Sequence, residues 1–182
     1  MLRNKMKYVS LGIIVLFLLQ GCVSKEEAAE ELMQYFNEDI RTELSDRYNE
    51  KVTKRFDLEE ENIEDEIQLH LNEEIIPAAK DFIDYLETLH YESRAVRRLN
   101  ELDIKINKLF YEAFQDMEKA LGEGSTIDEV NREYESQNQK VKKMSEKYFE
   151  NRDKLIQKYD LESYRDYEGD GKGEQKLRKK NE

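Results

Sequence analysis

The chain of 182 residues carries 42 acidic and 30 basic side chains, so its formal net charge is -12. A chain this acidic repels polyanions, which argues against nucleic-acid binding, because phosphate contacts need clustered lysine or arginine. A single proline and 7 glycines leave few helix breakers, which favours long helices. With 40% of its residues charged, the composition also borders on the disordered class, so hydrophobic periodicity has to decide between the two.

The first 21 residues have the parts of an export signal. Arg3, Lys5 and Lys7 form a basic head, and Leu11–Leu19 has no polar side chain. This apolar run is too short to span a bilayer, which takes about 20 residues. A basic head, a short apolar run and a small residue before a cut site are typical of a signal peptide. Removal of the segment changes the formal charge from -12 to -15, because it holds three basic residues and no acid.

Leu19-Gln20-Gly21-Cys22 closes this segment, and Cys22 is the only cysteine of the chain. These four residues resemble the lipobox of bacterial lipoproteins. The resemblance implies a diacylglycerol on the sulfur of Cys22, a cut between Gly21 and Cys22, and a mature protein held on the extracytoplasmic face of the cell membrane. Two acyl chains anchor stably, whereas one anchors marginally. The alternatives are an ordinary signal peptide and an uncleaved signal anchor with a chance cysteine.

Apolar residues recur at helical spacing in the mature chain. Apolar residues at every fourth position predict a first helix over about 26–56. Because an α-helix has 3.6 residues per turn, a stripe of residues spaced by four must wrap around the helix, or the helix must bend. The next helical pattern is interrupted by Pro77, where we expect a kink or a break, since proline lacks an N–H and clashes with the carbonyl of Glu73. The pattern then covers 82–121 without a breaker, which predicts one long helix.

Gly122-Glu123-Gly124-Ser125 predicts a turn, with Gly122 as the glycine that caps the helix. Thr126 and Glu129 fit a capping box, which predicts that a third helix begins here and continues to about 160. Periodicity fades after Leu161, and no alternating pattern predicts a strand.

The expected fold is therefore all-α. It has a lipoprotein signal peptide over 1–21, a bundle domain over 22–162 and a flexible, charged and disordered tail over 163–182. The bundle is elongated and antiparallel, with three long helices, or four if Pro77 breaks the chain direction.

No catalytic or metal-binding motif stands out, so we predict a protein that is not an enzyme and holds no cofactor. His70 lies at helical spacing from Glu66 and from Glu73 or Glu74, which could suit a transition metal. Ile67, however, stands where carboxylate-bundle metal sites have a glutamate. We therefore predict a solvent-facing histidine among acids and no metal site.

Residues 166–174 resemble half of a calcium loop, with acids at positions 1, 3 and 5 and a glycine at position 6. Leu177 occupies position 12, where a bidentate glutamate belongs, so a flexible acidic segment is expected and weak calcium binding stays open. The basic residues after it form a small cluster that could touch anionic lipid, although a solvated tail is the expected interpretation; they are Lys176, Arg178, Lys179 and Lys180.

The lipobox, the helical pattern and the missing catalytic groups favour a membrane-anchored interaction or envelope-binding module. By layout alone, the order of elements also resembles the cell-wall-binding lipoproteins of Gram-positive bacteria, which implies a partner in the cell envelope. The alternative is an immunity or exclusion lipoprotein that intercepts a toxin, a phage protein or a conjugation protein at the cell surface. Such a role suits an acidic protein, which steers basic partners by charge.

Overall fold

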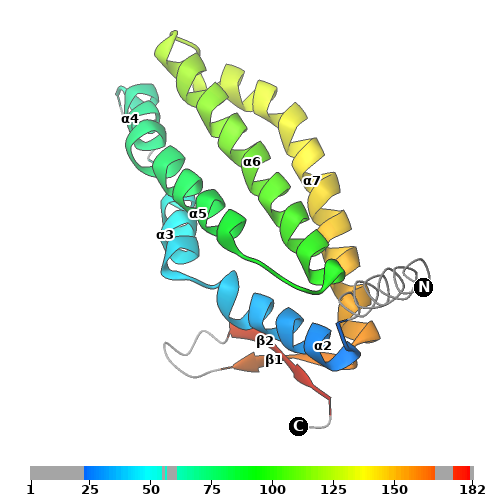
Figure 1. Ribbon diagram of the computed structural model, residues 1–182. Helices are drawn as coiled ribbons and strands as arrows, with labels where there is room; N and C mark the ends of the chain where they lie inside the picture. The colour runs from blue at the N-terminus through cyan, green and yellow to red at the C-terminus, as the bar shows by residue number, and fades with distance from the viewer. Residues whose placement is uncertain (1–22, 55, 57–60, 167–173, 181–182) are drawn as a thin grey trace, which may run out of the picture.

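The computed structural model describes residues 23–54, 56, 61–166 and 174–180, and most of these residues are helical (Figure 1). The all-α class predicted from the sequence is thereby confirmed. Helices α5 (Ile76–Thr88), α6 (Arg94–Gly122) and α7 (Ile127–Lys158) lie side by side, each antiparallel to the next. The predicted signal peptide and Cys22 lie outside the described residues.

The prediction of one continuous helix over 26–56 is wrong, because the structure has two separate helices there. Helix α2 (Lys25–Gln34) opens into a π-helical turn, η1 (Tyr35–Asp39), and the chain leaves the helix before α3 (Glu43–Val52) begins at its N-cap Thr42. A π turn is wider than an α turn. The stripe of residues spaced by four therefore does not follow one helix, because the helix first widens and then ends.

Pro77 does not break the chain direction. Helix α4 (Ile63–His70), the π-helical turn η2 (Leu71–Ile75) and α5 follow one another without an intervening residue, and the junction residues keep right-handed helical dihedrals. Pro77 is the second residue of α5. The wider turn directly before it accommodates the ring that would otherwise clash with the carbonyl of Glu73.

The long helix predicted over 82–121 is also wrong. Helix α5 ends at Thr88, residue Leu89 is extended with ψ 130°, and α6 begins at Arg94. No proline or glycine marks this reversal. Contacts with other elements fix it instead: the side-chain amide of Asn100 donates to the Leu86 carbonyl at 3.0 Å, and Ser93 caps α6.

Glu31 of α2 holds the same reversal from the other side. Its two carboxylate oxygens accept hydrogen bonds from the backbone N–H groups of Glu92 and Ser93, each at 2.8 Å. Ser93 is the N-cap of α6 and Glu92 precedes it, so neither N–H has a partner within the helix. A residue some sixty positions earlier therefore takes part in setting where α6 begins.

The turn between α6 and α7 is where the sequence was most informative. The capping box is confirmed: the Thr126 side chain accepts from the Glu129 N–H, and the Glu129 carboxylate accepts from the Thr126 N–H at 2.9 Å. Gly122 is the last residue of α6 rather than its cap. The left-handed residue is Gly124, with φ of 90°, a conformation that suits glycine because it has no Cβ.

The prediction of a disordered tail is wrong, because a β-hairpin forms in this segment. Strands β1 (Leu161–Asp166) and β2 (Glu174–Lys179) pair antiparallel, from Leu161 opposite Lys179 to Asp166 opposite Glu174. Asp160, with φ of 55°, turns the chain from α7 into β1. The predicted domain boundary at 162 thus falls inside a strand, and the hairpin belongs to the packed structure.

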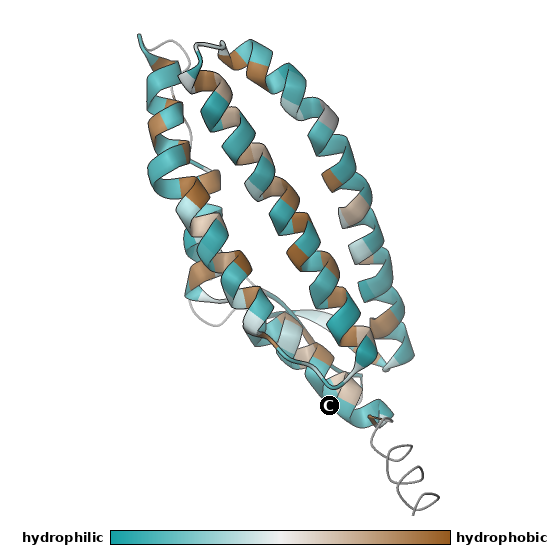
Figure 2. Ribbon diagram, turned by 45° about the horizontal axis from the view of Figure 1, so that its top comes forward, coloured by the Kyte–Doolittle hydropathy of each residue, from teal (hydrophilic) through white to brown (hydrophobic). Residues whose placement is uncertain are grey.

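Two hydrophobic clusters form the core. The first joins α2, η1, α6, α7 and the hairpin, and the second joins α3, η2, α5 and the distal parts of α6 and α7. Figure 2 shows apolar residues in stripes along α5 and α6, whereas α7 is mostly hydrophilic. The least exposed large side chains are Leu32, Tyr35, Leu86, Val96, Leu99 and Leu161.

Candidate functional site

A cleft of about 520 Å³ opens where η1, the second half of α7 and the hairpin meet. Its apolar lining comes from Phe36 of η1, Ile40 directly after η1, Phe149 and Ile156 of α7, and Leu177 of β2. Phe149 is 49% exposed, which is unusual for a side chain of this size, and it stands on the wall of the cleft. An apolar cleft edged with polar groups is a common form of binding site.

Two arginines line the cleft, and both are engaged by the protein. The Arg152 guanidinium lies 4.9 Å from the centre of the Phe149 ring and donates to Asp153 at 2.8 Å. Arg41 donates to the carbonyl of Phe36 at 2.8 Å and to the carbonyl of Gln175. The arginines therefore fix the walls of the cleft, and the cation above Phe149 favours the ring's exposed position.

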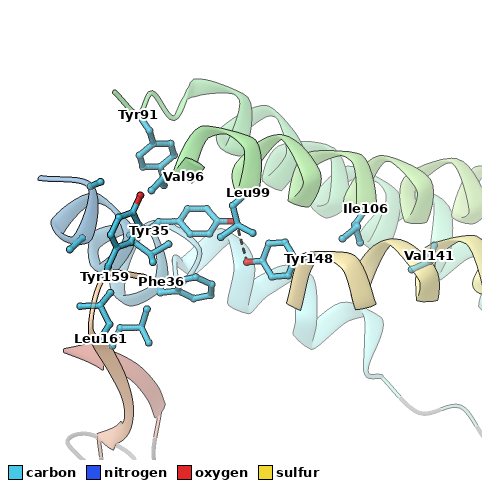
Figure 3. Packing of buried hydrophobic residues seen from close by; sticks show 14 residues of the cluster. Tyr35, Phe36, Tyr91, Val96, Leu99, Ile106, Val141, Tyr148, Tyr159 and Leu161 are labelled. Carbon is cyan, nitrogen blue, oxygen red and sulfur yellow. Dashed lines mark hydrogen bonds between the residues drawn. The ribbon is translucent and has the colours of Figure 1, made fainter. Parts of the chain in front are cut away.

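A buried polar network lies behind the cleft. The Tyr35 hydroxyl donates to Asp103 Oδ2 at 2.8 Å and lies 3.2 Å from the Tyr148 hydroxyl, which comes from α7 (Figure 3). Asn107 donates its side-chain amide to Asp103 Oδ1 at 3.0 Å. Tyr148 also lines the cleft, so this network links the cleft to the interior residues of η1 and α6.

Burial controls the acid–base properties of this network. It raises the pKa of the Asp103 carboxyl above its usual value, while the hydrogen bonds from Tyr35 and Asn107 act in the opposite direction. Burial likewise raises the pKa of Tyr35 and of Tyr148. Both tyrosines therefore stay protonated in the physiological range and act as hydrogen-bond donors.

A second tyrosine–aspartate pair extends the cluster. Tyr91, in the reversal before α6, donates to Asp39 Oδ2 at 2.6 Å, and its ring meets the Tyr35 ring edge-on at 5.7 Å. Burial, and then the Asp39 carboxylate, raise the pKa of Tyr91. Both tyrosines are therefore core residues, each with its hydroxyl on an aspartate.

Asn37 is one of the side chains that attach the hairpin to the wall of the cleft. The side-chain amide of Asn37 donates to the Leu177 carbonyl at 2.8 Å, and its Oδ1 accepts from the Leu177 N–H at 2.7 Å. These two bonds copy the pattern that a neighbouring strand would offer. Asn37 thus occupies part of the outer edge of β2, the kind of edge that folded proteins protect from pairing with other chains.

Replacing Asn37 by alanine is expected to detach the hairpin locally. The loss of two partly buried hydrogen bonds costs roughly 1–3 kcal/mol, because the Leu177 backbone groups lose their partners. Hydrogen exchange at the Leu177 amide should accelerate accordingly. Asn49→Ala is the matched control, since Asn49 is exposed on α3 and reaches only Ser45. Equal exchange at Leu177 in the two variants would contradict this role of Asn37.

The residues that the sequence singled out are not brought together. Cys22 and Gly21 lie outside the described residues. His70 is buried, at 4% exposure, so its predicted solvent-facing position is wrong. Its Nε2 lies 2.9 Å from the Lys51 carbonyl and must donate to it, while Nδ1 lies 3.3 Å from Glu74.

This arrangement makes His70 a structural residue between α3 and α4. Its ring lies edge-on to Phe56 at 5.2 Å, and Glu74 also pairs with Lys51 at 2.6 Å. The Lys51 contact lowers the pKa of the Glu74 carboxyl. Among the described residues, no group of three or more His, Cys, Asp or Glu side chains is placed to hold a metal ion.

The calcium-like segment falls mostly at 167–173, outside the described residues. Its first acid, Asp166, ends β1 and pairs with Lys176 at 2.7 Å. The basic cluster is not a solvated tail, since three of its members form ion pairs from β2: Lys176, Arg178 with Glu162 at 2.8 Å, and Lys179 with Glu30 at 3.5 Å.

Sequence reasoning missed the cleft altogether. Its walls come from segments more than 100 residues apart, and no local pattern joins Phe36 to Phe149 or Leu177. One signal was present: the stripe of α7 is thin, yet Phe149 falls beside Tyr148, off the inward face. An aromatic residue outside the apolar stripe of a mostly polar helix indicates that a second face of the helix takes part in contacts.

Comparisons with known proteins give no further guide. No protein-family model matches the chain, and no curated protein or solved structure matches it significantly. Among the described helices, none is long and apolar enough to cross a membrane.

Proposed function

We propose that the protein is a lipid-anchored extracytoplasmic interaction module, without catalytic activity, that holds a partner protein in the cleft between η1, α7 and the hairpin. The observation that carries the proposal is the position of the lipobox-like Cys22 directly before the fold. Val23 packs against the first core cluster, and Ser24 caps α2. A cut before Cys22 would therefore remove the export signal and leave every element of the fold intact.

The cleft supports recognition by contact. A partner would insert an apolar side chain between Phe149 and Ile156, and the opposite wall is held by Arg41 and Asn37 through backbone contacts. The mature chain's formal charge of -15 favours a basic partner through electrostatic steering. An envelope protein, a toxin or a phage protein would all meet this description, so the immunity role remains a special case of the same proposal.

The anchor is tested with Cys22→Ala. Cells fed a tagged fatty acid should label the wild-type chain and leave the variant unlabelled, because alanine has no sulfur to carry the lipid. Mass spectrometry of the wild-type chain should find the modified Cys22 at its N-terminus. A wild-type chain that begins elsewhere, or that takes up no fatty acid, would favour an ordinary signal peptide or an uncleaved anchor.

The cleft is tested with Phe149→Asp in protein used to capture partners from envelope extracts. The substitution should abolish capture, because it removes the exposed ring and puts a charged group, which is costly to desolvate, in its place. Leu69→Asp is the matched control, since Leu69 is also apolar and 55% exposed but lies on α4, outside the cleft. Capture that is lost equally in both variants, or in neither, would rule out the cleft as the partner site.

A further inference from the structure

We propose that one end of the fold rests directly on the phospholipid headgroups, so that the bundle stands on the membrane in a fixed orientation. This end, the basal face, comprises Lys25 and Glu26 at the start of α2, Tyr159 and Asp160 after α7, and Lys179 and Lys180 at the end of β2. The inference rests on the lipid anchor proposed for Cys22, and it adds the partner surface and the orientation.

The tether between lipid and fold is too short to act as a flexible linker. Val23 packs against the core, and Ser24 is held by the capping box, in which its N–H donates to Glu27 at 2.8 Å and its hydroxyl accepts from the Glu27 N–H at 3.0 Å. Consecutive Cα atoms are about 3.8 Å apart, so Cys22 stays within about 8 Å of Ser24. A diacylglycerol on Cys22 therefore brings the basal face to the headgroups.

Ion pairs and a backbone hydrogen bond join the three chain segments that form the basal face. Lys25 pairs with Asp160 at 2.8 Å, and the Lys180 N–H donates to the Asp160 carbonyl at 3.2 Å. Lys179 pairs with Glu30 of α2 at 3.5 Å. Figure 1 shows the start of α2 and the strands at the same end of the molecule, opposite the turn between α6 and α7. Contact with lipid at this end therefore orients the whole bundle.

Charge makes this end suitable for a headgroup surface. Its charged residues are three lysines, Lys25, Lys179 and Lys180, and two acids, Glu26 and Asp160. The mature chain as a whole carries -15, so the rest of the molecule is repelled by anionic lipid more strongly than this end. Lysine ammonium groups can meet lipid phosphates while their apolar stems stay on the protein.

The orientation places the rest of the molecule at defined heights. Helix α7 has 32 residues and rises about 1.5 Å per residue, so the turn at 123–125 stands about 48 Å from the basal face along the helix. Phe149, ten residues before Tyr159, lies about 15 Å along the same axis. The cleft is therefore close to the membrane, within reach of a partner that is itself membrane-bound or approaching the bilayer.

The test measures energy transfer from a dye on the protein to acceptors on headgroups. The lipidated mature protein is reconstituted in vesicles of mixed zwitterionic and anionic phospholipid. Because the only native cysteine carries the lipid, Glu26→Cys and Glu123→Cys each give one labelling site, and both positions are exposed. We expect strong transfer from position 26 and weak transfer from position 123. Equal transfer from the two positions would overturn the fixed orientation.

Two further variants separate the tether from the charge. A Gly–Ser spacer inserted between Cys22 and Val23 should lower transfer from position 26, since the fold is then free to move away. Lys180→Glu should lower it in anionic vesicles, whereas Lys119→Glu, near the distal turn, should not. A spacer without effect would show that the short tether does not set the orientation, and equal effects of the two charge reversals would exclude lysine contact with the headgroups.

Flotation with the vesicles distinguishes the two proposals. Wild-type protein that fails to float shows that the lipid anchor itself is wrong. Protein that floats, carries lipid on Cys22 and gives equal transfer from both positions shows that the anchor is right and the basal contact is wrong.

Discussion

Replacing Tyr35 by alanine is expected to lower the free energy of unfolding by about 3–5 kcal/mol, the range measured for large aromatic residues in protein cores. Tyr35 is fully buried, its ring meets Phe36 and Tyr91 edge-on, and its hydroxyl holds Asp103. Urea denaturation followed by circular dichroism measures the change. The loss should be large because both the ring contacts and a buried donor disappear together.

Tyr35→Phe separates the two contributions. It keeps the ring and removes only the hydroxyl, so we expect a loss of about 1–3 kcal/mol, because the partly buried Asp103 carboxyl and the Tyr148 hydroxyl each lose a partner. Tyr111→Phe is the control, since the Tyr111 hydroxyl has an exposed contact with Gln115. A Tyr35→Phe protein as stable as this control would show that the hydroxyl network contributes nothing to stability.

Asp103→Asn is expected to change how stability depends on pH. Burial raises the pKa of Asp103 in the folded chain, so the folded state holds its proton to higher pH than the unfolded state does. The contribution of this group to stability is therefore greatest below the unfolded pKa and is lost as pH rises through the folded value. From about pH 4 upward, the asparagine variant should gain stability relative to the wild type.

Geometry supports this substitution as a clean probe. Asparagine can keep an oxygen toward Asn107 and turn its amide toward the Tyr35 hydroxyl, which then donates to Tyr148. Glu129→Gln supplies the opposite sign, because contacts with Thr126 lower the pKa of Glu129 and its contribution is lost as pH falls. Parallel stability curves for wild type and Asp103→Asn between pH 4 and 7 would contradict the raised pKa.

Local chemistry decided those features that the sequence predicted correctly. The capping box at Thr126 and the turn before it were predicted because a hydroxyl, a glutamate three residues on and nearby glycines satisfy backbone groups within a few residues. The all-α class followed from periodicity for the same reason. Each of these depends on neighbours in the chain, so the sequence contains the whole interaction.

The wrong predictions have a different physical cause. The reversal at 89–93 has no breaker, and it exists because Glu31 and Asn100 satisfy backbone groups there. The hairpin has no predictive strand pattern, and it is held by Asn37 on its edge and by Leu161 and Leu177 in the core. A backbone group can be hydrogen-bonded by any distant side chain that folding brings near. Local sequence patterns do not show which side chain that is.

The sequence by itself determined the helical class, the acidic charge, the turn at 122–126 and the lipobox-like motif at Cys22. Only the tertiary structure decided the cleft beside Phe149, the burial of His70 and the grouping of Lys25, Asp160 and Lys180 at one end. The reason is that charge and helix propensity are properties of a segment, whereas a surface is formed by segments that meet only after the core has packed.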